Sequence, residues 1–356
     1  MQQATHRDTE IAESVRRVVR DALDAEAAKI ELLPAALGLR RFARVTLAGG
    51  PAATLVARVD APEDPAGRPP GIPPEPPLEP LRALLERCGL PVPACYGADE
   101  AAGIQLLEDA GSMSLCAFAR DAAPAERRAI YAEACDLVPR MQRVVDPDGR
   151  VAAFARRLDA AHFRYKAELF SEWSLPQRGR AASAGERACV REAFALIADE
   201  SARAPQRLAH RDLQSANLYV LPGRAAAKRL MLIDLQGALL APPEYDLACL
   251  LRDSYVELPE QEIEAHLARV RPQLPDAPEA AEFARRFDLL ALARKAKDHA
   301  RFLYAARRRE DERYLAHLPV TARHLRAAAE RSAERDPRFA ELAELIGALP
   351  EHSCAQ

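Results

Sequence analysis

The chain has 356 residues, of which 49% are hydrophobic and 29% are charged, and its net charge is −3. This balance excludes a disordered chain. The net charge does not indicate a nucleic-acid partner, and no run of about 20 apolar residues indicates a membrane span. No obligate protein partner is evident in the sequence. Seven scattered cysteines without a C-x-x-C pair indicate reduced thiols rather than disulfides or a zinc site, so we expect a cytoplasmic protein.

The first part of the chain mixes helical and strand patterns. In chain order we expect a helix over 10–30, a hairpin of strands at 45–47 and 54–59, a Pro-rich loop over 62–80, a helix over 81–88 and two short strands within 96–107. The turn Ala48-Gly49-Gly50-Pro51 joins the first two strands. The Pro-rich loop is expected to be extended, because proline continues neither a helix nor a central strand.

Helical periodicity dominates after Ser112. Helices are expected over 124–145, 151–170, 185–202, 260–270, 278–308 and 320–335, with one hairpin of strands at 217–221 and 229–233 between them. The whole pattern predicts an α+β protein with a small antiparallel-sheet lobe over 1–111 and a larger, mostly helical lobe over 112–356.

Polar clusters flank the second hairpin. The segment His210-Arg211-Asp212-Leu213-Gln214-Ser215-Ala216-Asn217 fits the H-R-D-x-x-x-x-N catalytic-loop pattern of protein kinases. In that pattern the Asp orients or accepts the proton of the acceptor hydroxyl, and the Asn holds a magnesium ion. Asp212 is therefore the predicted catalytic residue and Asn217 a predicted metal ligand.

Asp234 follows the partner strand of the hairpin, where the metal-binding Asp of a kinase D-F-G element would lie. An antiparallel hairpin brings the start of one strand beside the end of the other, so Asp212, Asn217 and Asp234 are expected at one end of the catalytic hairpin, 206–237. The alternative is that the His-Arg-Asp segment is a surface turn and Asp234 a loop cap. No Walker sequence supports a P-loop kinase.

These motifs resemble the aminoglycoside phosphotransferase and choline kinase group, which has a bilobal protein-kinase-like fold. The segment Leu240–Ala248 is similar to that group's G-x-P-x-x-Y-D-L-A, although Ala241 replaces the glycine. The resemblance implies that Asp246 supports the catalytic loop from behind, together with His210 and Arg211. It also implies an acceptor site in the helical lobe and ATP with Mg²⁺ between the lobes.

Within the group, the chain most resembles the N-acetylmuramate/N-acetylglucosamine anomeric kinases of peptidoglycan recycling. The similar segments are Arg40–Val45, Asp60-Ala61-Pro62, Leu106–Gly111 and the helical stretch Phe287–Tyr304. This resemblance implies transfer of phosphate from ATP to the C1 hydroxyl of an amino sugar. Two departures stand out, since Asp234-Leu235-Gln236-Gly237 replaces D-F-Q-D and Gln214 replaces a histidine.

The resemblance also suggests nucleotide contacts in the first lobe. Leu107, Glu108 and Asp109 lie in the expected hinge, near 107–111, and Arg58 stands nearest the V-A-I-K lysine position. Arginine can bind phosphate oxygens through two parallel hydrogen bonds, so Arg58 could take the role of the lysine. Glu79 and Glu86 are possible partners of Arg58, and an exposed strand residue is the alternative for Arg58 itself.

The acceptor is expected to be a small-molecule sugar. Gln236 is a candidate substrate contact, as are Arg294 and Lys297, which share a helix face and would suit a muramate carboxylate; the alternative is a solvated face. Trp173 is expected in the core, with sugar stacking as the alternative. An aminoglycoside or choline-like acceptor, or a pseudokinase without turnover, are the rival functions.

Overall fold

The computed structural model describes residues 2–34, 40–60, 69–226, 228–276 and 278–350. These residues form two compact units, one of Met1–Arg68 with Pro91–Ser112 and one of Pro69–Leu90 with Met113–Gln356. In the described stretches no helix is long and apolar enough to cross a membrane. Each unit is described by itself below.

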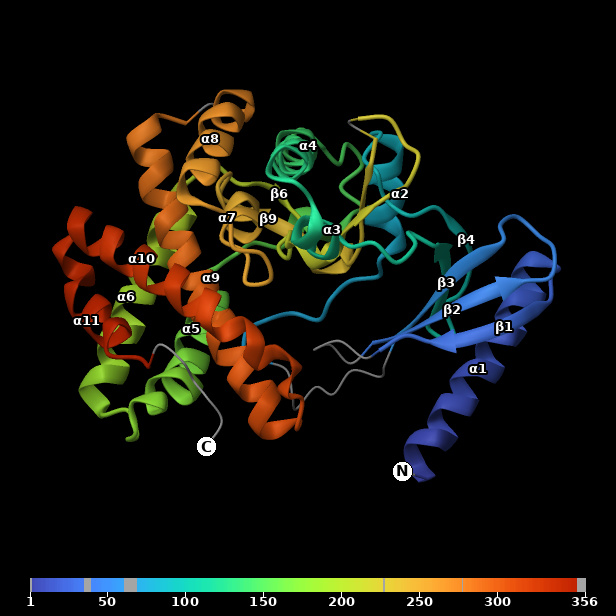
Figure 1. Ribbon diagram of the computed structural model, residues 1–356, viewed down its shortest axis with the longest axis horizontal. Helices are drawn as coiled ribbons and strands as arrows, with labels where there is room; N and C mark the ends of the chain where they lie inside the picture. The colour runs from blue at the N-terminus through green and yellow to red at the C-terminus, as the bar shows by residue number, and fades with distance from the viewer. Residues whose placement is uncertain (1, 35–39, 61–68, 227, 277, 351–356) are drawn as a thin grey trace. The chain divides into compact units, whose positions relative to one another are not determined.

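The first unit is an antiparallel sheet with one helix packed along it (Figure 1). Its elements are α1 (Gln2–Leu23), β1 (Ala27–Leu32), β2 (Arg41–Leu47), β3 (Thr54–Val59), β4 (Cys95–Asp99) and β5 (Ile104–Glu108). The strand order is β1-β2-β3-β5-β4. Side chains alternate along each strand, so every second residue faces α1 and the others face away.

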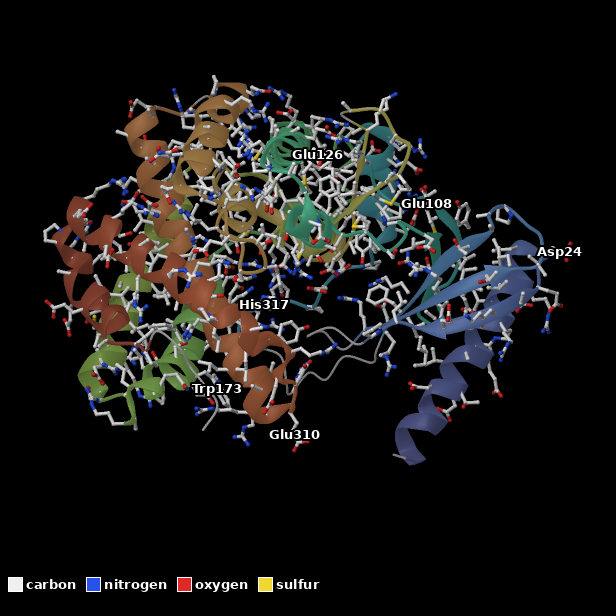
Figure 2. All side chains as sticks on the ribbon, viewed as in Figure 1. Asp24, Glu108, Glu126, Trp173, Glu310 and His317 are labelled. Carbon is white, nitrogen blue, oxygen red and sulfur yellow. The ribbon has the colours of Figure 1, made fainter. Side chains whose placement is uncertain are left out.

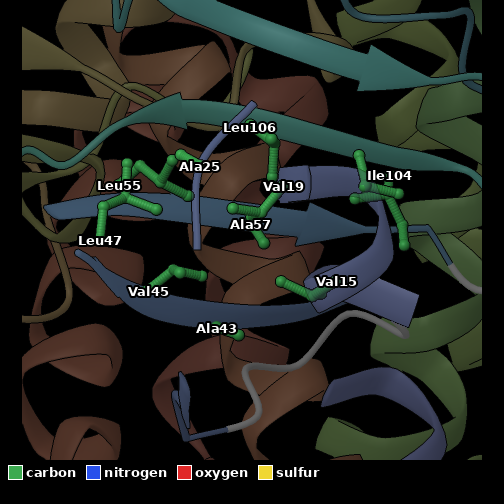
Figure 3. Close-up of a cluster of buried hydrophobic side chains, with 11 residues drawn as sticks. Val15, Val19, Ala25, Ala43, Val45, Leu47, Leu55, Ala57, Ile104 and Leu106 are labelled. Atoms are coloured by element: carbon green, nitrogen blue, oxygen red, sulfur yellow. The ribbon is translucent and has the colours of Figure 1, made fainter. Parts of the chain in front are cut away.

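The core of this unit lies between α1 and the sheet (Figure 3). Val15 and Val19 of α1 pack with Val45, Leu55 and Leu106 from three strands, and all five are fully buried. Burial of such side chains stabilises the unit by about 1.5–3 kcal/mol each. The helix approaches β4 closely at Gly97, where an added Cβ would lie only 2.8 Å from the Cβ of Ala22.

The second unit is mostly helical, and the long helix α9 runs through it (Figure 1). Its helices are α2 (Glu79–Arg87), α3 (Leu115–Asp121), α4 (Pro124–Gln142), α5 (Ala160–Leu169), α6 (Ala184–Arg203), α7 (Tyr245–Leu251), α8 (Glu260–Val270), α9 (Ala280–Arg308), α10 (Leu318–Arg335) and α11 (Ala340–Gly347). The helices α5, α7 and α10 all pack against α9.

Two short strand pairs carry the polar clusters of the second unit. The strand β6 (Arg207–Ala209) pairs with β9 (Leu239–Ala241), and β7 (Leu218–Val220) pairs with β8 (Leu230–Leu232), both antiparallel. Most residues of these strands are buried, which fixes their ends firmly. The second pair confirms the hairpin expected within 206–237.

The predicted fold class is confirmed, with a five-stranded sheet first and helices after it. The hairpin at 45–59 and the strands within 96–107 are also confirmed. The helix expected over 10–30 is wrong at its end, because Asp24 adopts a left-handed backbone (φ 48°) and β1 begins at Ala27. Ile30 and Leu32 then pack against the core while Lys29 and Glu31 point outward, which is a strand pattern.

The single helix expected over 151–170 is also wrong. A short 3-10 turn (η2, Ala152–Ala155) comes first, and an extended stretch then runs beside β9, where Leu240 and Leu158 donate backbone hydrogen bonds of 2.9 Å to Arg156 and Leu240. The helix α5 begins only at Ala160, because Asp159 caps it by accepting the N–H of His162.

The Pro-rich loop expected over 62–80 is described only from residue 69, and residues 62–68 lie outside the described residues, as do Ala61 and Pro62 of the D-A-P segment. From 69 to 78 it has neither helix nor strand, as expected. We expect the stretch 69–90 in the first lobe, over 1–111, whereas its contacts group it with the second unit. A built Cβ at Gly71 would lie 3.3 Å from the Cβ of Ala161, at the start of α5.

Candidate active site

The His-Arg-Asp segment leaves β6 and enters β7 through the turn η5 (Ser215–Asn217). The carbonyl oxygen of Asp212 accepts hydrogen bonds from the N–H of Gln214 and from the side-chain amide of Asn217, both at 2.9 Å. The N–H of Ile233 donates to the carbonyl of Asn217 at 3.0 Å. The hairpin thereby joins the catalytic loop to the residue that precedes Asp234.

Two residues of this region have left-handed backbones. Arg211 has φ 75°, and Asp234 has φ 63° and ψ 46°. For non-glycine residues such a conformation costs on the order of 1 kcal/mol and persists only where neighbouring groups enforce it. At Arg211 the enforcing group is a buried carboxylate.

That carboxylate belongs to Asp246, in the first turn of α7. It accepts the backbone N–H groups of His210 at 2.7 Å and Arg211 at 3.0 Å. Burial raises the pKa of Asp246, and the hydrogen bonds from the backbone N–H groups of His210 and Arg211 oppose the rise. The fully buried ring of His210 donates through Nε2 to the carbonyl of Ile233 at 2.8 Å, which ties the loop to β8.

Replacing Asp246 by Ala should destabilise the protein by about 2–5 kcal/mol, because two buried N–H groups lose a charged acceptor. Asp246→Asn keeps one acceptor oxygen and should cost less. Urea unfolding followed by circular dichroism measures both. The exposed Asp148→Ala is the control, and equal stability of D246A and D148A would contradict the assigned role.

A cluster of α9 side chains surrounds the carboxylate of Asp212. Arg294 donates to its Oδ1 at 2.6 Å and to the carbonyl of Arg211 at 3.0 Å. The same guanidinium also donates hydrogen bonds to Oε1 of Gln214 and to Oδ2 of Asp298, both at 3.0 Å. The Nζ of Lys297 lies 3.8 Å from Asp212 Oδ1. The solvated-face alternative is therefore wrong for Arg294, which is 2% exposed.

The cations control the charge of the predicted catalytic residue. Burial alone would raise the pKa of Asp212, but Arg294, Lys297 and Arg211 hold that pKa well below its usual range. Asp298, which also meets Arg294, has a pKa lowered in the same way despite its burial. Asp212 is thus ionised at neutral pH, and its orientation is fixed by two cations on one helix.

The end of the hairpin offers ligands for a magnesium ion. Asp234 supplies a carboxylate and Asn217 an amide oxygen, and Mg²⁺ in kinases binds few protein oxygens, together with phosphate oxygens and water. The described residues contain no cluster of three or more His, Cys, Asp or Glu side chains. The donor set fits Mg²⁺. Gln236, a predicted substrate contact, donates to the Asp234 carboxylate and is buried.

The predicted nucleotide contacts lie in the first unit. Arg58 is 4% exposed, which excludes the exposed-strand alternative. Its guanidinium meets Asp60 Oδ1 at 2.7 Å and Gln105 Oε1 at 2.7 Å. Glu79 and Glu86, considered as its partners, instead bind Arg82 at 2.7 and 3.0 Å.

The hinge residues use their side chains to fix the chain after β5. Leu107 is buried, and Glu108 (Figure 2) bonds to both backbone groups of Ala94, through its N–H at 2.8 Å and its carboxylate at 3.1 Å. Asp109 accepts from Arg44 at 2.8 and 3.0 Å. Burial raises its pKa, but Arg44 lowers it further, below the usual range. The side chains of Glu108 and Asp109 are therefore both engaged within the first unit.

Several residues that surround the catalytic loop were not anticipated. The carboxylate of Asp253, just after α7, accepts hydrogen bonds from the N–H of Ser215 at 2.9 Å and from its hydroxyl. These two hydrogen bonds hold the turn η5 in place. Asp298 and Lys295 extend the network of Arg294 along α9. The sequence signal was weak, since Lys295 and Asp298 stand in a run of charged residues on α9 and Asp253 stands after the end of α7, and their partners lie elsewhere in the chain. Trp173 (Figure 2) packs edge-on against Tyr304, with ring centroids 5.2 Å apart.

An antiparallel five-stranded sheet followed by a helical unit with a His-Arg-Asp loop and a short hairpin is a protein-kinase-like phosphotransferase fold. The chain belongs to the phosphotransferase enzyme family, whose model matches residues 29–283. Solved structures show the same fold. A choline kinase from Streptococcus pneumoniae has a TM-score of 0.61 at 18% identity, covering 92% of this chain and 99% of its own. An ADP-bound aminoglycoside phosphotransferase has a TM-score of 0.54 at 14% identity, covering 91% and 99%.

The relatives found by sequence comparison have a more specific name than the family. A protein from Pseudomonas aeruginosa named N-acetylmuramate/N-acetylglucosamine kinase is 28% identical over 279 residues, which cover 75% of this chain and 76% of that protein. A protein of the same name from Neisseria meningitidis is 26% identical and covers 86% of this chain and 88% of its own. The predicted family resemblance is therefore confirmed.

Proposed function

We propose that this protein is an ATP- and Mg²⁺-dependent kinase that phosphorylates the anomeric C1 hydroxyl of an amino sugar, N-acetylmuramate or N-acetylglucosamine, in peptidoglycan recycling. The names of the relatives support the acceptor. The observation that carries the chemistry is the ionised carboxylate of Asp212, fixed by Arg294 where the β7–β8 hairpin begins. Such a carboxylate is what phosphoryl transfer to a hydroxyl requires.

Asp212 accepts a hydrogen bond from the C1 hydroxyl and aligns its oxygen with the terminal phosphorus. As the new O–P bond forms and the bond to the leaving ADP breaks, the hydroxyl proton passes to Asp212. Its low pKa makes it a weak base, which suits a loose transition state in which the proton leaves late. Orientation is then its main contribution.

Asn217 and Asp234 are the proposed magnesium ligands, and the bound ion would neutralise charge on the phosphates. Arg58 is the proposed phosphate contact, and the backbone of Leu107, Glu108 and Asp109 the proposed adenine contact. The first lobe would thus bind the nucleotide and the helical lobe the acceptor. His210, Arg211 and Asp246 keep the catalytic loop in place.

The charge around Asp212 favours some acceptors over others. Arg211, Arg294 and Lys297 all act on this carboxylate, and Asp298 is the second acid bound to Arg294. A choline-like amine or an aminoglycoside would bring another positive charge beside these cations. A neutral or acidic sugar avoids that repulsion, so the amino sugar is the better proposal.

An ADP-release assay with Mg-ATP tests the proposal over N-acetylmuramate, N-acetylglucosamine, choline and kanamycin. We expect release with the amino sugars only, and a product that has lost its reducing end because C1 carries the phosphate. ADP release with choline or kanamycin alone would show that the acceptor is that compound and not an amino sugar. Magnesium-dependent ATP binding without release with any acceptor would show a pseudokinase.

A further inference from the structure

Three buried polar side chains near the catalytic loop have no role in the chemistry described so far. Arg156, at the end of η2, is 9% exposed, and His162 and Lys166, one turn apart on α5, are each 4% exposed. Lys and Arg are rarely buried unless they are paired. Within the part of the chain that the structure describes, neither cation lies at ion-pair distance from a carboxylate, and the charge of Glu75 acts on Arg156 from farther away.

Several polar atoms of these side chains have no hydrogen-bond partner among the described residues. Arg156 donates through Nη1 to the carbonyls of Gln236 and Ala238 at 3.4 and 3.5 Å, while its Nε and Nη2 meet no partner among the described residues. Those two nitrogens form the edge of a guanidinium that binds both oxygens of a carboxylate. His162 binds Asp159 through Nδ1 at 2.8 Å, and its Nε2 likewise lacks a described partner.

Lys166 is held mainly by aromatic rings. Its Nζ lies 4.8 Å from the ring centre of Phe163, 5.1 Å from that of Tyr245 and 3.4 Å from the hydroxyl of Tyr245. These contacts give an ammonium only partial compensation for the water it loses. An anion beside Nζ of Lys166 would supply the remaining compensation for the lost hydration.

The groups lie beside the catalytic loop and the loop that follows Asp234. Nη1 of Arg156 contacts the carbonyls of Gln236 and Ala238, and a Cβ added at Gly237 would lie 3.5 Å from Nη1 of Arg211. Lys166, one turn from His162, contacts the hydroxyl of Tyr245, and the next residue along α7 accepts the N–H of Arg211. Burial and the charge of Arg211 both lower the pKa values of all three groups. Arg211 immediately precedes Asp212, which is proposed to align the acceptor hydroxyl, so the anion that suits this group is one carried by the acceptor.

The protein supplies one carboxylate here itself. Glu75, in the described end of the Pro-rich loop, lies 3.6 Å from Nη1 of Arg211. A Cβ added at Gly237 would lie 3.5 Å from that nitrogen and 3.7 Å from Oε1 of Glu75. Glu75 shows that a carboxylate fits beside Arg211 and next to the loop that follows Asp234.

Resting on the proposed function, we propose that Arg156, His162 and Lys166, together with Arg211, form a subsite for a carboxylate of the acceptor sugar. The enzyme then prefers N-acetylmuramate, whose lactyl group carries a carboxylate, over the neutral N-acetylglucosamine. Without that carboxylate the buried donors stay unpaired, which penalises the neutral sugar. Glu75 competes for Arg211 until the acidic sugar displaces it.

Steady-state kinetics with both sugars test the subsite. Lys166→Met removes the charge but keeps the length of the side chain, and Arg156→Lys keeps the charge but removes the Nε–Nη2 edge. Each should raise KM for N-acetylmuramate by about tenfold or more and change KM for N-acetylglucosamine by less than about threefold. Glu75→Gln should lower KM for N-acetylmuramate only. Arg164→Met, an exposed cation on α5, is the matched control and should change neither.

The outcomes separate the subsite from the proposed function. If both sugars are substrates and the variants change their KM values equally or not at all, the subsite is refuted and the function stands. An equal rise accompanied by a higher KM for ATP would assign the cations to phosphate instead. If wild-type protein neither binds N-acetylmuramate in calorimetry nor phosphorylates either sugar, the proposed function fails and the subsite fails with it.

Discussion

Asp212→Asn should lower kcat by about 10²- to 10⁴-fold and leave the affinity for ATP within about threefold of wild type. Asparagine has the shape of the carboxylate but cannot accept the hydroxyl proton, and it no longer attracts Arg294 as an ion. The guanidinium remains paired with Asp298, so the fold should survive the change. Single-turnover kinetics measure the chemical step, and calorimetry with ATP measures binding.

Asp148→Asn removes an exposed carboxylate and is the control for this variant. Turnover of D212N within about tenfold of wild type would remove Asp212 from the chemistry. Loss of ATP binding together with turnover would mean that the substitution disturbs the site more widely, and Asp212 would then have a structural role instead.

Lys166→Met should make the protein more stable at neutral pH and flatten the dependence of its stability on pH. Burial lowers the pKa of Lys166 from 10.5 to about 7, with further lowering by Lys297 and Arg294. Between these two values the unfolded chain binds a proton that the folded protein does not, so unfolding becomes harder as pH rises. At about 1.4 kcal/mol per pH unit, wild type should gain about 2–3 kcal/mol from pH 7 to pH 9.

Urea unfolding at pH 6, 7, 8 and 9 measures this gain, and the difference between wild type and K166M isolates Lys166 from other groups that titrate. Below pH 7 the lysine is charged in both states, so the full cost of its burial is present and K166M should have its largest advantage. Parallel curves for the two proteins from pH 6 to 9 would show that burial does not lower the pKa of Lys166. Arg164→Met should follow wild type.

The catalytic-loop pattern could be recognised in the sequence because its residues lie close together in the chain. His210, Asp212 and Asn217 lie within eight residues, and the turn between two apolar runs predicted the hairpin that joins Ile233, the residue before Asp234, to Asn217. Asp246 became recognisable only through a family resemblance, because its partners are the backbone N–H groups of residues 35 and 36 positions earlier. No local pattern encodes that contact.

The surroundings of Asp212 were harder to predict for a related reason. Arg294 lies 82 positions from Asp212, on a helix with charges on several faces, so spacing alone did not show whether it is buried. Arg156 was hidden because the segment 151–170 has helical periodicity throughout, although Asp159 starts a new helix within it. For Lys166 a signal existed, since Phe163, Ala167 and Phe170 around it form the buried face of the helix.

The helix α9 lies almost entirely beyond residue 283, where the match to the family model ends. Arg294, Lys297 and Asp298 are therefore outside the matched region, although Arg294 fixes the carboxylate inside it. A hybrid protein that joined residues 29–283 of this chain to the C-terminal part of a distant homologue would keep every catalytic-loop motif. It would nevertheless take the group that pairs with Asp212 from the homologue, so the orientation of this carboxylate depends on a helix that the family match almost entirely leaves out.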